Sequence, residues 1–156
     1  MTITRKFKRT ITPPAVRVGP AGRRGRGVYA TRRIRRGEVF EQSPVIVVPA
    51  SQWRHLRQTI LADYAFDWGP SSRGAAVVLG YGSLYNHSRT PNARFDYRMA
   101  QGIYEFIALR DIARGEEICT NYNGLPEDLR PLWFEPPPAS KKPQRKAAKK
   151  KGARKR

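Results

Sequence analysis

Hydrophobic residues fall along this chain in short runs, and glycine, proline and asparagine separate one run from the next. Runs of four to eight residues that are rich in Val, Ile, Tyr and Phe and bounded by turn residues are typical of β-strands. We therefore predict strands at 16–18, 28–30, 39–40, 45–48, 64–68, 75–79, 95–97, 104–109 and 118–122. The β-branched run at 45–48, between two prolines, predicts a buried strand, and the runs at 95–97 and 104–109 predict a hairpin.

Only one segment has the spacing of a helix. Ser51 is a suitable N-cap for a short helix from Gln52 to Leu61. Four apolar side chains, those of Trp53, Leu56, Ile60 and Leu61, share one face of that helix, so we expect this face to pack in the core.

Many short strands with little helix predict a mostly-β domain. We place this domain at 15–135, after a basic N-terminal lead at 1–14 and before a tail at 136–156 that begins with three prolines. The tail contains Lys, Arg and Ala but no larger apolar residue beyond its first few positions, so we expect it to be disordered.

Charge divides the chain in the same way. Residues 1–36 carry 12 basic residues and no acid, and residues 141–156 carry ten basic residues and no acid. The middle, 37–140, holds nine arginines, no lysine and all 12 acidic residues. A mildly acidic body therefore lies between two basic ends. The basic ends are suited to nucleic acid, so a nucleic-acid partner is an open possibility for the tail.

Other features bound the class of protein. The chain has no run of 18 apolar residues, and Met1–Lys8 is not followed by an apolar region, so we expect no membrane span and no secretory signal. The one cysteine, Cys119, stands outside any Cys/His cluster, so we expect neither a disulfide nor a metal site. These features predict a cytoplasmic or nucleoid-associated protein, with a host nucleus as the alternative if the protein is exported; they predict no oligomeric state.

Three segments have the residue types of a ligand site. Gly25-Arg26-Gly27 either lets a ligand approach the backbone or forms an ordinary hairpin loop. Asn86-His87-Ser88, followed by Pro91-Asn92, is either a polar turn or a set of ligand contacts. The third segment, Gly115 to Tyr122, combines two glutamates with a terminal Asn-Tyr pair.

Taken together and in this order, the three segments resemble the motifs of the SET-domain protein lysine methyltransferases. The first motif continues through Ala30, Ile34 and Gly37–Phe40, and the likeness spans about 15 to 125. The resemblance implies a threaded fold, in which the chain after the last motif passes through a loop formed by the preceding one. Such threading is rare among proteins. It also implies methyl transfer from S-adenosyl-L-methionine to lysine.

The resemblance implies a role for each motif residue. Arg26, Gly27, Tyr29, Asn86 and His87 would contact the cofactor, and Tyr122 would be catalytic. The substrate channel would be formed by Tyr81, Phe95 and Thr120. Neither Phe95 nor Thr120 offers a phenolic hydroxyl, so we expect the product to progress beyond monomethyllysine.

The chain also departs from the family pattern. It lacks the Cys-rich zinc-binding segment that follows many SET domains. In this respect it resembles the compact viral and bacterial members of the family, which also lack that segment. Leu132-Trp133-Phe134 then either closes over the site or packs the C-terminus onto the core. A histone or another basic protein is the expected substrate. The alternative is a nucleic-acid-binding protein that keeps an inactive SET domain as a scaffold.

Overall fold

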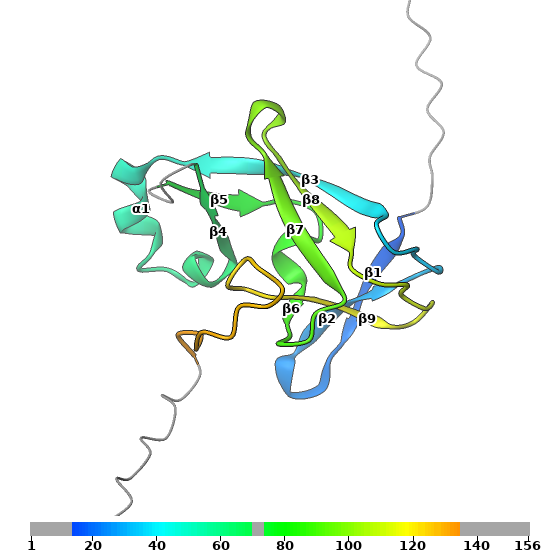
Figure 1. Ribbon diagram of the computed structural model, residues 1–156. Helices are drawn as coiled ribbons and strands as arrows, with labels where there is room; N and C mark the ends of the chain where they lie inside the picture. Colours follow the sequence, from blue (N-terminus) through cyan, green and yellow to red (C-terminus); the bar gives the residue numbers. More distant parts are fainter. Residues whose placement is uncertain (1–13, 70–73, 135–156) are drawn as a thin grey trace, which may run out of the picture.

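The computed structural model describes residues 14–69 and 74–134 of the 156-residue chain. The predicted tail at 136–156 and all but the last residue of the basic lead lie outside these ranges. The described chain forms two β-sheets and several short helical segments (Figure 1). None of the helices in the described part is long and apolar enough to cross a membrane.

The smaller sheet has the strand order β1-β2-β9-β6. Its strands are β1 (Val16–Pro20), β2 (Arg26–Ala30), β9 (Glu117–Thr120) and β6 (Asn86–His87). The β1–β2 hairpin turns through the short 3-10 helix η1 (Gly22–Arg24), where Gly25 has a φ of +75° that favours glycine. The first two strands predicted from the sequence are thus confirmed, with the Gly/Arg loop between them.

The larger sheet has the order β4-β5-β3-β8-β7 and is antiparallel throughout. Its strands are β3 (Val39–Val48), β4 (Ala65–Trp68), β5 (Gly74–Val78), β7 (Ala93–Arg98) and β8 (Ile103–Ala108). The predicted hairpin is confirmed: β7 and β8 pair from Ala93↔Ala108 to Arg98↔Ile103 around η4 (Met99–Gln101), and Gly102 closes the turn with a left-handed φ of +63°.

One hydrophobic core joins the two sheets. Val28 and Ile118 of the smaller sheet and Ala76 and Phe106 of the larger one are each 0% exposed and belong to the same cluster. A backbone bridge between Ile34 and Ile112, both also fully buried, pins together the loops that lead into β3 and β9. The expectation of a mostly-β fold is confirmed.

The helical prediction was only partly right. Helix α1 runs from Ala50 to Leu56, with Pro49 rather than Ser51 at its N-cap, and a separate 3-10 helix, η2 (Ile60–Tyr64), follows. Neither contains a buried residue, and Ile60 and Leu61 are 72% and 44% exposed, so the expected core face is wrong. The α-helix ends after seven residues, about two turns, which places the later apolar residues off the predicted face.

The strand at 45–48 is confirmed as the end of β3, but it is not a buried strand. Ile46 and Val47 are 56% and 46% exposed, while Val48 is buried. A run of β-branched residues predicts extended backbone, but it does not report whether a second layer covers each face of the sheet.

Candidate active site

The second and third motifs meet because β6 and β9 are parallel neighbours. Asn86 pairs with Cys119 and His87 with Thr120, and the Ser88 amide donates to the Thr120 carbonyl at 2.9 Å. Parallel strands need a long crossover, here the whole β7–β8 hairpin. Beyond β9 the Tyr122 amide donates to Nδ1 of His87 at 3.2 Å, which fixes that ring nitrogen as an acceptor. Whether the chain threads through a loop stays a prediction.

The glycine loop joins the other two motifs at Asn86. The side-chain nitrogen Nδ2 of Asn86 donates to the Arg26 carbonyl at 3.0 Å and to the Glu117 carboxylate at 2.8 Å. A Cβ at Gly27 would lie 2.5 Å from Glu117 Oε1 and 3.0 Å from Asn86 Nδ2. Glycine is therefore needed at 27 so that these two side chains can lie against β2. Glu117 also forms an ion pair with Arg24 at 2.5 Å.

Asn92 holds the third motif against the second. Its side chain is 4% exposed and donates to Glu116 Oε1 at 3.0 Å and to the Glu117 carbonyl at 2.8 Å. Its oxygen accepts from the Cys119 amide at 2.9 Å. The Asn of the Pro-Asn pair thus fixes the position of β9, which carries Tyr122 to the site.

The Tyr122 side chain is held by a single backbone acceptor. Its hydroxyl donates to the Tyr85 carbonyl at 2.8 Å, which leaves the oxygen lone pairs to accept a hydrogen bond. Burial raises the pKa of Tyr122, and nearby Cys119 adds to the effect. The phenol is therefore neutral at physiological pH, so this group can orient an amine but cannot serve as a base.

A half-buried carboxylate, that of Glu41, fixes Tyr85 in turn. Glu41 accepts hydrogen bonds from the Tyr85 hydroxyl, from Ser43 Oγ at 2.6 Å and from the Tyr81 amide at 2.9 Å. Burial, followed by the charge of Glu41, holds the pKa of Tyr85 well above its usual value. The Tyr85 side chain is thereby kept in one orientation beneath Tyr122.

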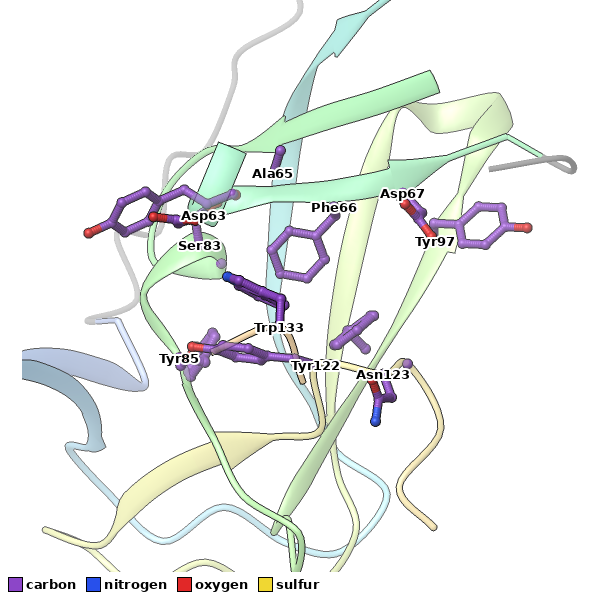
Figure 2. A pocket seen from close by; sticks show the side chains of 14 residues that line it. Asp63, Ala65, Phe66, Asp67, Ser83, Tyr85, Tyr97, Tyr122, Asn123 and Trp133 are labelled. Atoms are coloured by element: carbon purple, nitrogen blue, oxygen red, sulfur yellow. The ribbon is translucent and has the colours of Figure 1, made fainter. Parts of the chain in front are cut away.

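A cavity of about 340 Å³ opens beside Tyr122, within the size range of small-molecule sites. Aromatic rings and two aspartates form most of its wall (Figure 2). Its lining includes Asp63, Tyr64, Phe66, Asp67, Tyr85, Phe95, Tyr97, Tyr122 and Trp133. Phe66 and Phe95 contact each other edge to face, with centroids 5.0 Å apart. The wall is largely apolar and suited to a long aliphatic side chain.

A second cavity, of about 280 Å³, is also lined by Tyr122 and is more polar in character. Arg24, Arg26 and Asn86 line it together with Leu84 and Phe134. The Arg26 guanidinium lies over the Tyr64 ring, 5.9 Å from its centroid. The two cavities share the wall residues Asp63, Tyr64, Ser83, Tyr122 and Trp133. Tyr122 thus stands where a cationic cavity meets an aromatic one.

The C-terminal end of the described chain closes over both cavities. Trp133 stacks on Tyr122 with centroids 6.2 Å apart and an interplanar angle of 16°, as Figure 2 shows. Phe134 contacts His87 and Tyr122 edge to face at 6.5 and 6.4 Å. Leu132 is buried, whereas Trp133 and Phe134 are 66% and 55% exposed. Both sequence alternatives therefore apply: Leu132 packs on the core, and the two aromatic residues close the site.

The sequence pattern of the SET domain matches residues 25–123, which include every motif described above. The chain belongs to the SET-domain family. It is 33% identical over 114 residues, 72% of each chain, to the histone-lysine N-methyltransferase of Schizosaccharomyces pombe that is specific for H3 lysine 37. Members of this family generally use S-adenosylmethionine. The chain is accordingly a protein-lysine N-methyltransferase, and its substrate is a lysine-bearing protein.

Solved SET-domain structures share the fold. A Plasmodium falciparum protein described as a histone methyltransferase superposes with a TM-score of 0.57 at 24% identity, over 71% of this chain and 95% of its own. CpSET8 of Cryptosporidium superposes with a TM-score of 0.59 at 21% identity, over 75% of this chain and 59% of its own.

The predicted SET residues divide into three groups by position. Four of them line the cavities: Arg26, Asn86, Phe95 and Tyr122. Two others contact a lining residue, Gly27 lying against Asn86 and His87 against Tyr122. Three others line neither cavity. Tyr29 lies on β2 with its hydroxyl on the Pro20 carbonyl at 2.5 Å. Thr120 is 1% exposed and Tyr81 packs against the core, and their predicted role as channel walls stays a prediction.

Sequence reasoning missed most of the aromatic wall. Phe66 and Tyr97 lie on β4 and β7, outside the family motifs, and they look like ordinary strand residues in the sequence. Only their alternation with residues that face the other side of the sheet sets them apart, and this signal does not separate a cavity from a core. Among the described residues, no group of His, Cys, Asp and Glu side chains is placed to hold a metal ion.

Proposed function

We propose that this enzyme methylates a lysine of a histone or histone-like basic protein, with S-adenosyl-L-methionine as the methyl donor. The observation that carries the proposal is the meeting of two chemically different cavities at Tyr122. Two reactants bound in cavities that share Tyr122 as a wall residue are held in a fixed geometry, and such alignment supplies much of the acceleration in bimolecular transfers.

The second cavity fits the donor by its chemistry. The guanidinium groups of Arg24 and Arg26 suit a carboxylate, although Arg24 already pairs with Glu117. The Phe134 ring offers an apolar face to a purine, and Asn86 offers polar groups of its backbone and side chain for hydrogen bonds to the donor. S-adenosylmethionine, when bound, supplies an activated methyl group on a sulfonium.

The first cavity fits the lysine. At pH 7.4 only about one free lysine amine in a thousand is neutral, and reaching that state costs about 4 kcal/mol. A wall of aromatic rings removes water from the amine and so lowers its pKa. The Tyr122 hydroxyl donates its hydrogen bond to the Tyr85 carbonyl, so its oxygen is suited to accept a hydrogen bond from an N–H of the amine and to direct the nitrogen lone pair.

Two observations support a basic protein as substrate. Asp63 and Asp67 line the first cavity and are exposed, so they favour cationic residues on either side of the target lysine. The relative from Schizosaccharomyces pombe acts on lysine 37 of histone H3, which makes that position the first to test.

The test is methylation of recombinant histones with labelled S-adenosylmethionine, followed by mass spectrometry of the product. Histone H3 with lysine 37 replaced by arginine is the matched control, because it keeps the charge and removes the acceptor. We expect label in the unmodified histone and its loss in the control. Label on basic non-histone proteins alone would overturn the histone assignment, and label on no protein would overturn the function.

The same assay identifies the product state. Phe95 and Tyr85 both line the first cavity. Phe95 has no hydroxyl, and the hydroxyl of Tyr85 is engaged by Glu41. Both observations support progression beyond monomethyllysine. Product that remains monomethylated at long reaction times would contradict it.

A further inference from the structure

Lysine is absent from the body of this enzyme. From Arg9 to Ser140, both included, the chain has 18 arginines and no lysine, whereas residues 141–156 have seven lysines and three arginines. The two segments therefore differ in which basic residue they use, arginine in the first and mainly lysine in the second. Outside the tail, the only lysines of the chain are Lys6 and Lys8. The amines that this enzyme could methylate on itself are thus confined to its two ends.

The described chain also ends at the site. Trp133 lines both cavities, and Phe134 lines the second one. Lys141 comes seven residues after Phe134 in the sequence. An extended segment of that length spans at most about 24 Å, so Lys141 stays within that distance of Phe134, a range that includes the mouth of the first cavity. A lysine tethered in this way is present at a high effective concentration.

The rim of the first cavity carries the charge that such a segment requires. Asp63, on η2, and Asp67, on β4, both line it and are exposed, as Figure 2 shows. Within the described chain, neither carboxylate forms a hydrogen bond or an ion pair with a side chain, whereas Asp111 pairs with Arg33 and Asp128 with Arg130. Residues 141–156 carry ten cations and no acid. The cavity rim and the segment 141–156 therefore carry opposite charges, and only a short stretch of sequence separates Phe134 from Lys141.

We propose that lysines of the segment 141–156 enter the first cavity of the same molecule and are methylated there. This inference rests on the proposed function. The ammonium proton first passes to water. The nitrogen lone pair then forms a bond to the methyl carbon of S-adenosylmethionine, and the bond from that carbon to sulfur breaks with its electrons remaining on sulfur. The products are methyllysine and S-adenosylhomocysteine.

The first test incubates the full chain with labelled S-adenosylmethionine and no other substrate, with histone H3 in a parallel sample. We expect methyl groups on 141–156 at a first-order rate that does not depend on protein concentration. The double substitution Lys141→Arg and Lys142→Arg keeps the charge and should remove the label from those two positions without affecting histone methylation. Label on histone with none on the tail overturns the inference and leaves the proposed function standing. Label on neither overturns both.

The second test needs no methyl donor. A carbodiimide joins a carboxylate to an amine only when the two are in contact, so it reports where the tail lies. We expect amide links from Asp63 or Asp67 to tail lysines and their loss in the Asp63→Asn, Asp67→Asn double variant. Links that form equally with the exposed Asp111 overturn the inference, as does a rate of self-methylation that rises with protein concentration.

Discussion

At the scale of single residues, the site depends on a hydroxyl that is oriented but not ionised. Burial raises the pKa of Tyr122, and its proton is directed to the Tyr85 carbonyl. We predict that Tyr122→Phe keeps the fold and the affinity for S-adenosylmethionine but loses at least about a hundredfold in kcat, the usual scale for a positioned catalytic group. Calorimetry measures the affinity and a methylation assay the rate. Near-normal turnover by a folded variant would show that the hydroxyl has no catalytic role.

Gly27 has a packing role in addition to the cofactor contact that its motif predicts. A Cβ there would meet the Glu117 carboxylate at 2.5 Å, so Gly27→Ala should push Glu117 and Asn86 out of place. We expect a loss of about 1–3 kcal/mol in the free energy of unfolding and weaker cofactor binding.

A double-mutant cycle supplies the control for Gly27. Because Glu117 is the closest contact, Gly27→Ala should cost less in a Glu117→Ala background than in the unmodified chain. Urea unfolding of the four proteins measures this coupling. Strictly additive losses would mean that the contact with Glu117 is not the reason for glycine.

At the scale of elements, the segment after β9 acts as a cover that the sequence alone left undecided. Trp133 stacks on Tyr122 yet is 66% exposed, so it adds little to the core. We predict that Trp133→Ala changes the free energy of unfolding by less than about 1 kcal/mol but lowers kcat/KM for the protein substrate roughly tenfold or more. Leu129→Ala is the matched control, because Leu129 is also 66% exposed but lines neither cavity. Equal effects of the two changes would contradict a covering role.

Glu116, in the turn before β9, makes the free energy of unfolding depend on pH. Burial alone would raise the pKa of Glu116, but hydrogen bonds from Arg110, the Ala113 amide and Asn92 outweigh it and lower that pKa. A carboxyl with a lowered folded-state pKa stabilises the fold above its unfolded pKa of about 4.3, and this stabilisation disappears as the pH falls through the folded-state value.

We therefore predict that Glu116→Gln is less stable than the unmodified protein at pH 6 and that the difference shrinks as the pH falls below about 4. Several other carboxyls, such as Glu38 and Asp128, are shifted in the same direction, so the difference between the two proteins is the informative quantity. Chemical unfolding at a series of pH values measures it. A difference that stays constant across the series would mean that the Glu116 charge contributes no stability.

Elements whose local sequence pattern is typical of a strand or turn were predictable. Elements whose position depends on distant parts of the chain were not. The β7–β8 hairpin follows from two apolar runs around a glycine turn. The parallel pairing of β6 with β9 involves two residues on one side, far too few for any periodicity, and only the likeness to a family placed Asn86 beside the third motif. Ile60 and Leu61 fit a helical face, but the local chain breaks before they reach the core.

At the scale of the whole molecule, the motif residues were predictable and the shape of the cavities was not. Tyr122 and Asn86 occur in recognisable patterns, whereas Phe66, Tyr97 and Trp133 reach the first cavity only through the packing of β4, β7 and the end of the described chain. Thr120 shows the converse case, because its position in the motif predicts a channel wall, whereas in the structure it is 1% exposed and lines neither cavity. Motif spacing fixes a residue along the chain, while the side of a strand that faces a cavity depends on the sheet around it.

The division between body and tail gives the last prediction. Residues 141–156 contain no apolar side chain larger than alanine, so they have little to bury in a core, and truncation after Ser140 should leave the temperature of unfolding unchanged within about 1 °C. The same truncation removes ten cations, which should weaken binding to duplex DNA and flatten its salt dependence by up to about 0.9 log units per lost phosphate contact. Calorimetric melting and salt titrations of DNA binding measure the two effects. A truncated chain that unfolds or loses cofactor affinity would place the tail inside the domain.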